Sequence, residues 1–133
     1  MKINKKQLLY LVIAICLIGA GLRFYKLGKA PIALFGDELD IGYQAYSLFK
    51  TGKDYLGNRF PIYFQSFDEY RMPLLVYLSS PIVGIFGLSA FSLRFLPALM
   101  GVLNIGLFSL LIWELTESKF KTLLSAIILT ITP

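Results

Sequence analysis

Long apolar stretches separated by short polar segments dominate the chain. The first apolar stretch follows three lysines and predicts a membrane-spanning helix over residues 7–25, because about 20 apolar residues cross a bilayer. Residues 90–113 predict a second span, and residues 122–133 have the pattern of an incomplete third span. A compact polar turn, residues 114–121, is expected between these two. The pattern therefore predicts an all-α integral membrane protein of which this chain is the amino-terminal piece.

Residues 26–89 form the predicted loop between the first two spans, and two helices are expected within it. Apolar residues at helical spacing predict an amphipathic helix from Leu39 to Lys50. A Gly-Asn turn and an irregular aromatic stretch are expected after this helix. Residues 73–86 predict a short helix at the membrane interface, because two prolines and the short length disfavour a span. The alternative partition is a membrane-crossing helix over residues 73–93.

Composition supports the membrane class, because 56% of the residues are hydrophobic and the mean hydropathy is +0.68. The net charge of +5 comes from scattered lysines and arginines, which indicates attraction to anionic lipid headgroups and no nucleic-acid partner. The chain has no histidine, the commonest metal ligand, and a single cysteine, Cys16, provides no disulfide framework.

Charge next to the first span gives an expected orientation. The lysines before the span predict a cytoplasmic amino terminus and an external loop over residues 26–89, whereas Arg23, Lys26 and Lys29 oppose this orientation. A basic start followed by an apolar run is also typical of a signal peptide. No small-x-small cleavage site follows the run at the right place, so a retained span is expected, with Arg23 and Lys26 extending to the far interface.

Three carboxylates, those of Asp37, Glu38 and Asp40, lie within four positions between apolar stretches. The apolar sequence on both sides predicts that these acids lie near a bilayer surface, where a carboxylate with an altered pKa can carry out proton chemistry. The alternative is that Asp37 caps the helix expected to begin near Leu39, because acidic residues are favoured at helix amino termini. The two roles are compatible with each other.

Several short motifs in a fixed order give a family resemblance. After the first span come Phe-Gly-Asp-Glu, Tyr-Ser-Leu-Phe-Lys-Thr-Gly-Lys-Asp, Tyr-Leu-Gly-Asn-Arg-Phe-Pro-Ile, Tyr-Arg-Met-Pro-Leu-Leu-Val-Tyr-Leu and Phe-Gly-Leu-Ser-Ala-Phe-Ser-Leu-Arg-Phe-Leu-Pro-Ala-Leu-Met-Gly. With these motifs the chain, from residue 8 to its end, resembles the amino-terminal part of the GT-C membrane glycosyltransferases. The group that it resembles most is the protein O-mannosyltransferase-like one, related to the lipid A aminoarabinose transferases.

The resemblance implies transfer of a sugar from a polyprenyl-phosphate donor to a hydroxyl of a protein, lipid or glycan acceptor, with inversion at the anomeric carbon. It assigns catalysis to Asp37, with Glu38 beside it, and the carboxylate would take the proton of the attacking hydroxyl. A cation is expected to meet the donor phosphate, Arg71 as first choice and Arg59 as second. The alternatives are that Arg71 contacts lipid headgroups and that Arg59 is solvated. The chain has Arg-Met-Pro-Leu-Leu here, where related sequences often have a lysine, two prolines and Leu-Tyr.

The resemblance also gives expected roles for the remaining polar residues. Asp68 and Glu69 are expected to contact the sugar or the acceptor, with a solvated loop as the alternative. Arg94 matches an arginine before the next span and is expected to pack or to contact lipid, and Trp113 is expected to anchor the span at the interface. Neither a divalent metal nor another cofactor is expected.

The expected location is the plasma membrane, with the catalytic loop outside. Residues 1–133 alone are expected to insert into membranes without transferring sugar, because the family's site also draws on later loops. Two other functions fit the same pattern. One is a non-catalytic binding or assembly module, and the other is a component of a transporter for lipid-linked sugars.

Overall fold

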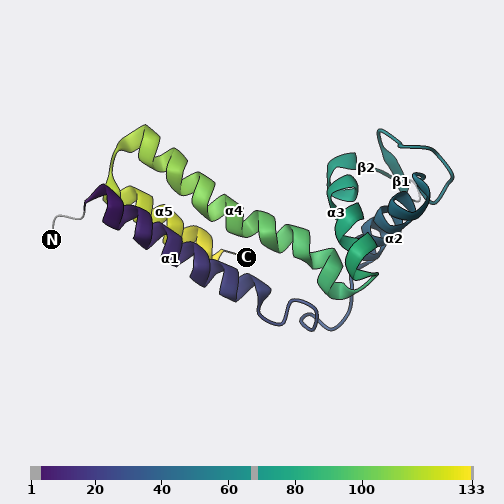
Figure 1. Cartoon of the computed structure of the whole chain (residues 1–133), viewed down its shortest axis with the longest axis horizontal. Helices are drawn as coiled ribbons and strands as arrows, with labels where there is room; N and C mark the ends of the chain where they lie inside the picture. The colour runs from purple at the N-terminus through teal and green to yellow at the C-terminus, as the bar shows by residue number, and fades with distance from the viewer. Residues whose placement is uncertain (1–3, 67–68, 133) are drawn as a thin grey trace. The chain divides into compact units, whose positions relative to one another are not determined.

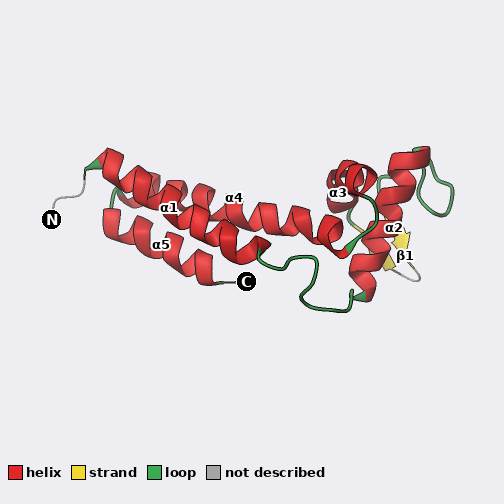
Figure 2. Ribbon diagram, turned by 60° about the horizontal axis from the view of Figure 1, so that its bottom comes forward, coloured by secondary structure: helices red, strands yellow, loops and turns green. Residues whose placement is uncertain are grey.

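The structure, a computed structural model, describes residues 4–66 and 69–132. The element order is α1 (Lys5–Phe24), α2 (Gly36–Thr51), β1 (Phe64–Ser66), β2 (Glu69–Arg71), α3 (Pro73–Phe86), α4 (Ala90–Thr116) and α5 (Lys119–Ile131), as Figure 1 shows. The protein is mostly helical, and two short strands are its only departure from helix and loop among the described residues (Figure 2). The chain divides into two compact units, Met1–Tyr25 with Pro97–Pro133 and Lys26–Leu96.

The first unit consists of helices. α1 and α5 lie side by side, and Ile105 of α4 is fully buried where the backbone of α1 at Gly19 leaves room for it. α1 and α4 are long and apolar enough to cross a membrane, and only a small share of their most apolar stretches, 11% and 22%, is buried. The Nζ atom of Lys5 lies 5.8 Å from the ring centroid of Trp113, so the start of α1 and the end of α4 meet at one end of this unit.

The polar turn expected over residues 114–121 is shorter than predicted. α4 continues to Thr116 and α5 begins at Lys119, so only Glu117 and Ser118 lie between the helices. The side chain of Ser118 caps α5 by accepting a hydrogen bond from the backbone N–H of Lys121. The predicted boundaries were wrong because polar residues can occupy the last turn of one helix and the first turn of the next.

Arg23, which was expected to extend to the far membrane interface, is bound to backbone oxygens of residues 129–132. Its guanidinium donates hydrogen bonds to the carbonyl oxygens of Leu129 and Thr132, at 2.7 and 2.8 Å, and to that of Thr130 at 3.4 Å. Arg23 therefore joins α1 to residues 129–132 within the same unit.

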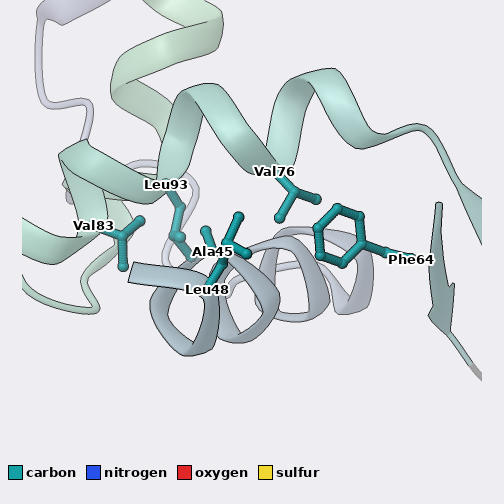
Figure 3. Packing of buried hydrophobic residues seen from close by; sticks show 6 residues of the cluster. All are labelled: Ala45, Leu48, Phe64, Val76, Val83 and Leu93. Atoms are coloured by element: carbon teal, nitrogen blue, oxygen red, sulfur yellow. The ribbon is translucent and has the colours of Figure 1, made fainter. Parts of the chain in front are cut away.

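In the second unit, α2 and α3 pack against each other around a small apolar core. Figure 3 shows this cluster, which consists of Ala45, Leu48, Phe64, Val76, Val83 and Leu93. β1 and β2 form an antiparallel hairpin in the register Phe64↔Arg71 and Ser66↔Glu69, which places the ring of Phe64 in the core. The stretch that the sequence predicted to be irregular therefore contains a hairpin. The hairpin places Arg71 at the end of β2.

α2 begins three residues earlier than predicted. It starts at Gly36, with the extended residue Phe35 as its N-cap, so Asp37 lies inside the first turn and does not cap the helix. Glu38 instead accepts a hydrogen bond from the backbone N–H of Phe35, at 3.1 Å. Acidic residues in the first turn are favoured by the helix dipole, which explains why the helix includes them. At its other end, Gly52 stops the helix with a φ of 67°.

α3 is a 14-residue helix with Pro73 at its start, and it ends at Phe86. Gly87, with a φ of 76°, separates it from α4. A continuous helix over residues 73–93, the alternative partition, is therefore wrong. At 14 residues α3 is also shorter than the roughly 20 that a membrane span requires. Its location at a membrane interface stays a prediction.

Candidate functional site

Asp37, Asp40 and Arg71 form an ion-paired triad within the unit Lys26–Leu96. The two aspartates are three positions apart on α2 and therefore share a face of the helix. The Nη2 atom of Arg71 lies 2.6 Å from Oδ1 of Asp37, and its Nε atom lies 2.8 Å from Oδ2 of Asp40. The structure thus brings together the predicted base and the predicted phosphate-binding cation, which are 34 positions apart in the sequence.

The two aspartates of this triad differ in their access to water. The side chain of Asp37 is 57% exposed, whereas that of Asp40 is 11% exposed. The paired atoms Oδ2 of Asp40 and Nε of Arg71 are both buried, and among the described residues each has only the other as a polar partner. An exposed ion pair such as Asp37–Arg71 contributes only about 0–1 kcal/mol to stability, because water competes with it. The Asp37 carboxylate is therefore accessible and weakly held, and of the two aspartates it is the one that can reach a reactant.

Glu38 points to a different partner, Arg94, near the start of α4. Oε1 and Oε2 of Glu38 accept hydrogen bonds from Nε and Nη2 of Arg94, at 2.8 and 3.0 Å. The guanidinium also donates to the carbonyl oxygens of Leu27, Pro31 and Ala33, at 3.0 to 3.3 Å. These contacts hold the segment before α2 against the start of α4.

Arg94 had been expected to pack or to contact lipid. It is 7% exposed, and its guanidinium is bound by a carboxylate and by backbone oxygens, so contact with lipid headgroups is wrong. Hydrogen bonds from Arg94 lower the pKa of the Glu38 carboxyl below its ordinary value of 4.5, although partial burial opposes the shift. Glu38 is therefore charged at neutral pH, and its carboxylate binds Arg94 within the folded unit. Its assignment to catalysis stays a prediction.

The other predicted site residues are less closely associated with the triad. Arg59 is exposed, pairs with Lys53 in an isolated β-bridge, and makes no hydrogen bond or ion pair with the triad among the described residues. Glu69 is exposed on β2 and lines the same small pocket as Arg71. Asp68 lies outside the described residues.

Two open cavities are each lined by one residue of the triad. The larger, of about 730 Å³, is mostly apolar and is lined by Gly36, Leu39, Asp40, Tyr43, Tyr55, Leu56 and Gln65. The smaller, of about 310 Å³, is lined by Ile41, Glu69, Tyr70, Arg71, Met72 and Leu75. Both volumes lie in the range of roughly 300–1,000 Å³ that small-molecule sites occupy. Asp40 therefore lines one cavity while its partner Arg71 lines the other.

A metal site does not form in the part of the chain that the structure describes, where no three metal-ligating side chains cluster. The expectation that a divalent metal is not required stays a prediction. The sequence reasoning assigned no role to Asp40 as the second partner of Arg71. The spacing Asp37-x-x-Asp40 on one helix face was the available signal. No comparable local signal links Glu38 to Arg94, because 56 positions separate them.

No family model matches the chain, and no curated protein and no solved structure matches it.

Proposed function

We propose that the chain is part of a membrane glycosyltransferase that moves a sugar from a polyprenyl-phosphate carrier to an acceptor hydroxyl. The observation that supports this proposal is the contact between Asp37 and Arg71, at 2.6 Å beside two open cavities. A carboxylate and a guanidinium are the two groups that this reaction needs. The carboxylate takes a proton, and the guanidinium binds a phosphate.

Asp37 is the proposed general base. The acceptor oxygen attacks the anomeric carbon, its proton passes to the Asp37 carboxylate, and the bond between the sugar and the carrier phosphate breaks. The polyprenyl phosphate departs with the electron pair of that bond. Because a phosphate is already a good leaving group, a second carboxylic acid to protonate it is unnecessary, unlike in a glycoside hydrolase. The exposure of Asp37 leaves room for an acceptor to approach.

Arg71 is the proposed partner of the carrier phosphate. It lines the 310 Å³ pocket together with Ile41, Met72 and Leu75, whose apolar side chains suit the isoprenoid next to the phosphate. The larger cavity beside Asp40 has room for the sugar and the acceptor. An arginine can bind two phosphate oxygens at once, so a lysine is not required for this role.

The proposed location is the plasma membrane, with α1 and α4 as spans and residues 26–89 on the external face. Two helices of sufficient length and hydropathy support the membrane part of this proposal. The meeting of Lys5 and Trp113 supports the placement of the amino terminus and residues 114–121 on one side of the membrane.

The test is Asp37→Asn in the full-length protein, assayed in membranes with radiolabelled polyprenyl-phosphate mannose as the first donor. Asparagine keeps the shape of the side chain and an oxygen for Arg71, but it removes the basic carboxylate. We expect transfer to fall by about 10²-fold or more at saturating donor and acceptor. Near-normal turnover of the folded variant would overturn the assignment of Asp37 as the base.

Glu38→Gln is the matched control, because it neutralises the adjacent acid. Since Glu38 is bound to Arg94, we expect less folded protein but near-normal turnover for each folded molecule. An equal loss of turnover in both variants would indicate that charge in this segment, and not one base, controls the rate.

The alternative is a non-catalytic binding or assembly module. The observation that favours it is that Asp37, Glu38 and Asp40 are all ion-paired with arginines of the same unit, as purely structural acids would be. Under this alternative Asp37→Asn changes stability slightly and leaves every transfer activity of the full-length protein unchanged. The same assay therefore separates the two functions.

A further inference from the structure

The two carboxylates that share Arg71 are held in different ways. Asp37 contacts the terminal Nη2 atom from an exposed position, whereas Asp40 contacts the inner Nε atom from a buried one. The guanidinium therefore has one pair that water can reach and one that it cannot. Water and added anions compete directly for the first pair, while opening the second leaves two buried charged atoms without partners.

We propose that Asp40 is a positioning residue that holds Arg71 in place, and that Asp37 is an exchangeable partner, which the phosphate of a prenyl phosphate replaces at Nη2. The choice of a prenyl phosphate rests on the proposed transferase function. The division of roles rests on the contacts and the burial of the triad.

This arrangement links donor binding to the release of the base. While Arg71 holds Asp37, one carboxylate oxygen is occupied by the cation. When a phosphate oxygen takes the Nη2 position, the Asp37 carboxylate becomes free to accept the proton of the acceptor hydroxyl. Asp40 keeps the guanidinium beside α2 during this exchange, so Arg71 does not follow the phosphate away from the base.

The two cavities beside the triad support the exchange, because Arg71 and Asp40 line different ones. Arg71 lines the pocket whose other walls include Ile41, Met72 and Leu75, so an anion with an apolar tail can enter from that side. Asp40 lines the other cavity and is not among the residues that line this pocket. The 310 Å³ pocket is therefore the proposed entry for an anion that binds Arg71.

The test measures binding of citronellyl phosphate, a short prenyl phosphate, to the full chain of 133 residues. The protein is held in dodecyl maltoside, a detergent without phosphate, and circular dichroism confirms that each variant is folded. We expect Asp37→Asn to bind several-fold more tightly, because a competing anion has been removed. We expect Asp40→Asn to bind about tenfold more weakly or worse, because Arg71 loses its anchor.

The opposite signs of these two effects are decisive. If both aspartates acted only through their negative charge, removing either would tighten the binding of an anion. Tighter binding in both variants, or no effect in either, would therefore overturn the positioning role of Asp40. Asp40→Glu, which keeps the carboxylate, should recover part of the affinity. Glu114→Gln, which removes an acid from α4 in the other unit, should bind like the unchanged chain.

Nuclear magnetic resonance gives a second measurement that does not depend on affinity. The chain contains only four arginines, and Arg71→Lys identifies the Nε–H signal of Arg71 in protein labelled with ¹⁵N-arginine. We expect this signal to stay protected from exchange when citronellyl phosphate is added, and to lose protection in Asp40→Asn. Loss of protection on adding the phosphate to the unchanged chain would contradict the proposal.

Separate additions distinguish the source of the phosphate. Citronellol tests the apolar tail without the anion, inorganic phosphate tests the anion without the tail, and short-chain phosphatidylglycerol tests a membrane headgroup. Preferential binding of citronellyl phosphate supports a prenyl phosphate as the ligand of Arg71. Equally tight binding of phosphatidylglycerol or inorganic phosphate overturns this assignment. None of these measurements involves sugar transfer. The exchange of Asp37 for a phosphate can therefore be confirmed even if the transferase assay fails, and the transferase assay can succeed even if the exchange is overturned.

Discussion

Asp37 and Glu38 are neighbours in sequence, but their carboxylates meet different arginines. Successive side chains of a helix point about 100° apart, so adjacent residues face different surroundings. Asp37 faces Arg71 of the hairpin, and Glu38 faces Arg94 near the start of α4. The sequence identified both acids as candidates for function. It could not separate their roles, because the two partners are 34 and 56 positions away.

The Glu38–Arg94 contact predicts a dependence of stability on pH. The folded protein lowers the pKa of Glu38 below 4.5, so the ionised form is favoured by folding. This contribution is fully present above about pH 4.5, the unfolded value, and is lost as the pH falls through the lower folded value. Thermal unfolding in detergent between pH 7 and pH 3 measures it.

Glu38→Gln isolates this contribution from that of the other acids. At pH 7 we expect the variant to be less stable by about 1–3 kcal/mol, because the buried guanidinium of Arg94 loses charged acceptors. The difference between the two proteins should shrink as the pH falls below 4.5. A difference that stays constant down to pH 3 would show that the Glu38 carboxylate is not stabilised in the folded protein.

At the scale of the elements, helices were easier to predict than their ends. Apolar runs and helical spacing located all the helices, because burial or lipid contact requires such patterns. The start of α2 was predicted too late, because the helix dipole favours acidic residues and Asp37 and Glu38 therefore lie inside its first turn. The hairpin was missed because its strands have three residues each, too few for an alternating pattern. That hairpin places Arg71, so the site could not be assembled from the sequence.

The contact between α2 and α3 depends on Gly84. A Cβ atom at this position would overlap the ring of Phe49, so the two helices approach more closely than a side chain would allow. We expect Gly84→Ala to lower the free energy of unfolding by about 1–3 kcal/mol. Gly21→Ala in α1 is the control, because nothing lies near its position and alanine favours a helix. Unfolding in detergent, followed by circular dichroism, measures both, and an unchanged stability of Gly84→Ala would contradict the close packing.

For the whole molecule, hydropathy predicts which segments can cross a membrane better than it predicts their direction. α1 and α4 have the expected length and apolar character, because a bilayer requires both. Direction depends on the lysines and arginines that flank the spans, and these oppose one another on the two sides of α1. The direction of the spans was therefore the least determined part of the sequence prediction. It requires a measurement.

Cysteine labelling measures the direction of the spans. The expected arrangement places residues 26–89 outside and residues 114–121 in the cytoplasm. Ile62→Cys reports on the loop, since this side chain is 84% exposed, and Glu114→Cys reports on the exposed carboxyl end of α4, next to the turn. Neither change alters a lysine or arginine, the residues that set topology, and Cys16 is first replaced by serine.

We expect a membrane-impermeant maleimide added to intact cells to label Ile62→Cys. Glu114→Cys should be labelled only after the membrane is permeabilised. Lysed cells provide the control that both thiols are reactive. The reverse pattern would place the Asp37–Arg71 pair on the cytoplasmic side, and the proposed external catalytic loop would then be wrong. Labelling of both thiols from outside would show that α4 does not cross the membrane, because a span between them must separate the two positions.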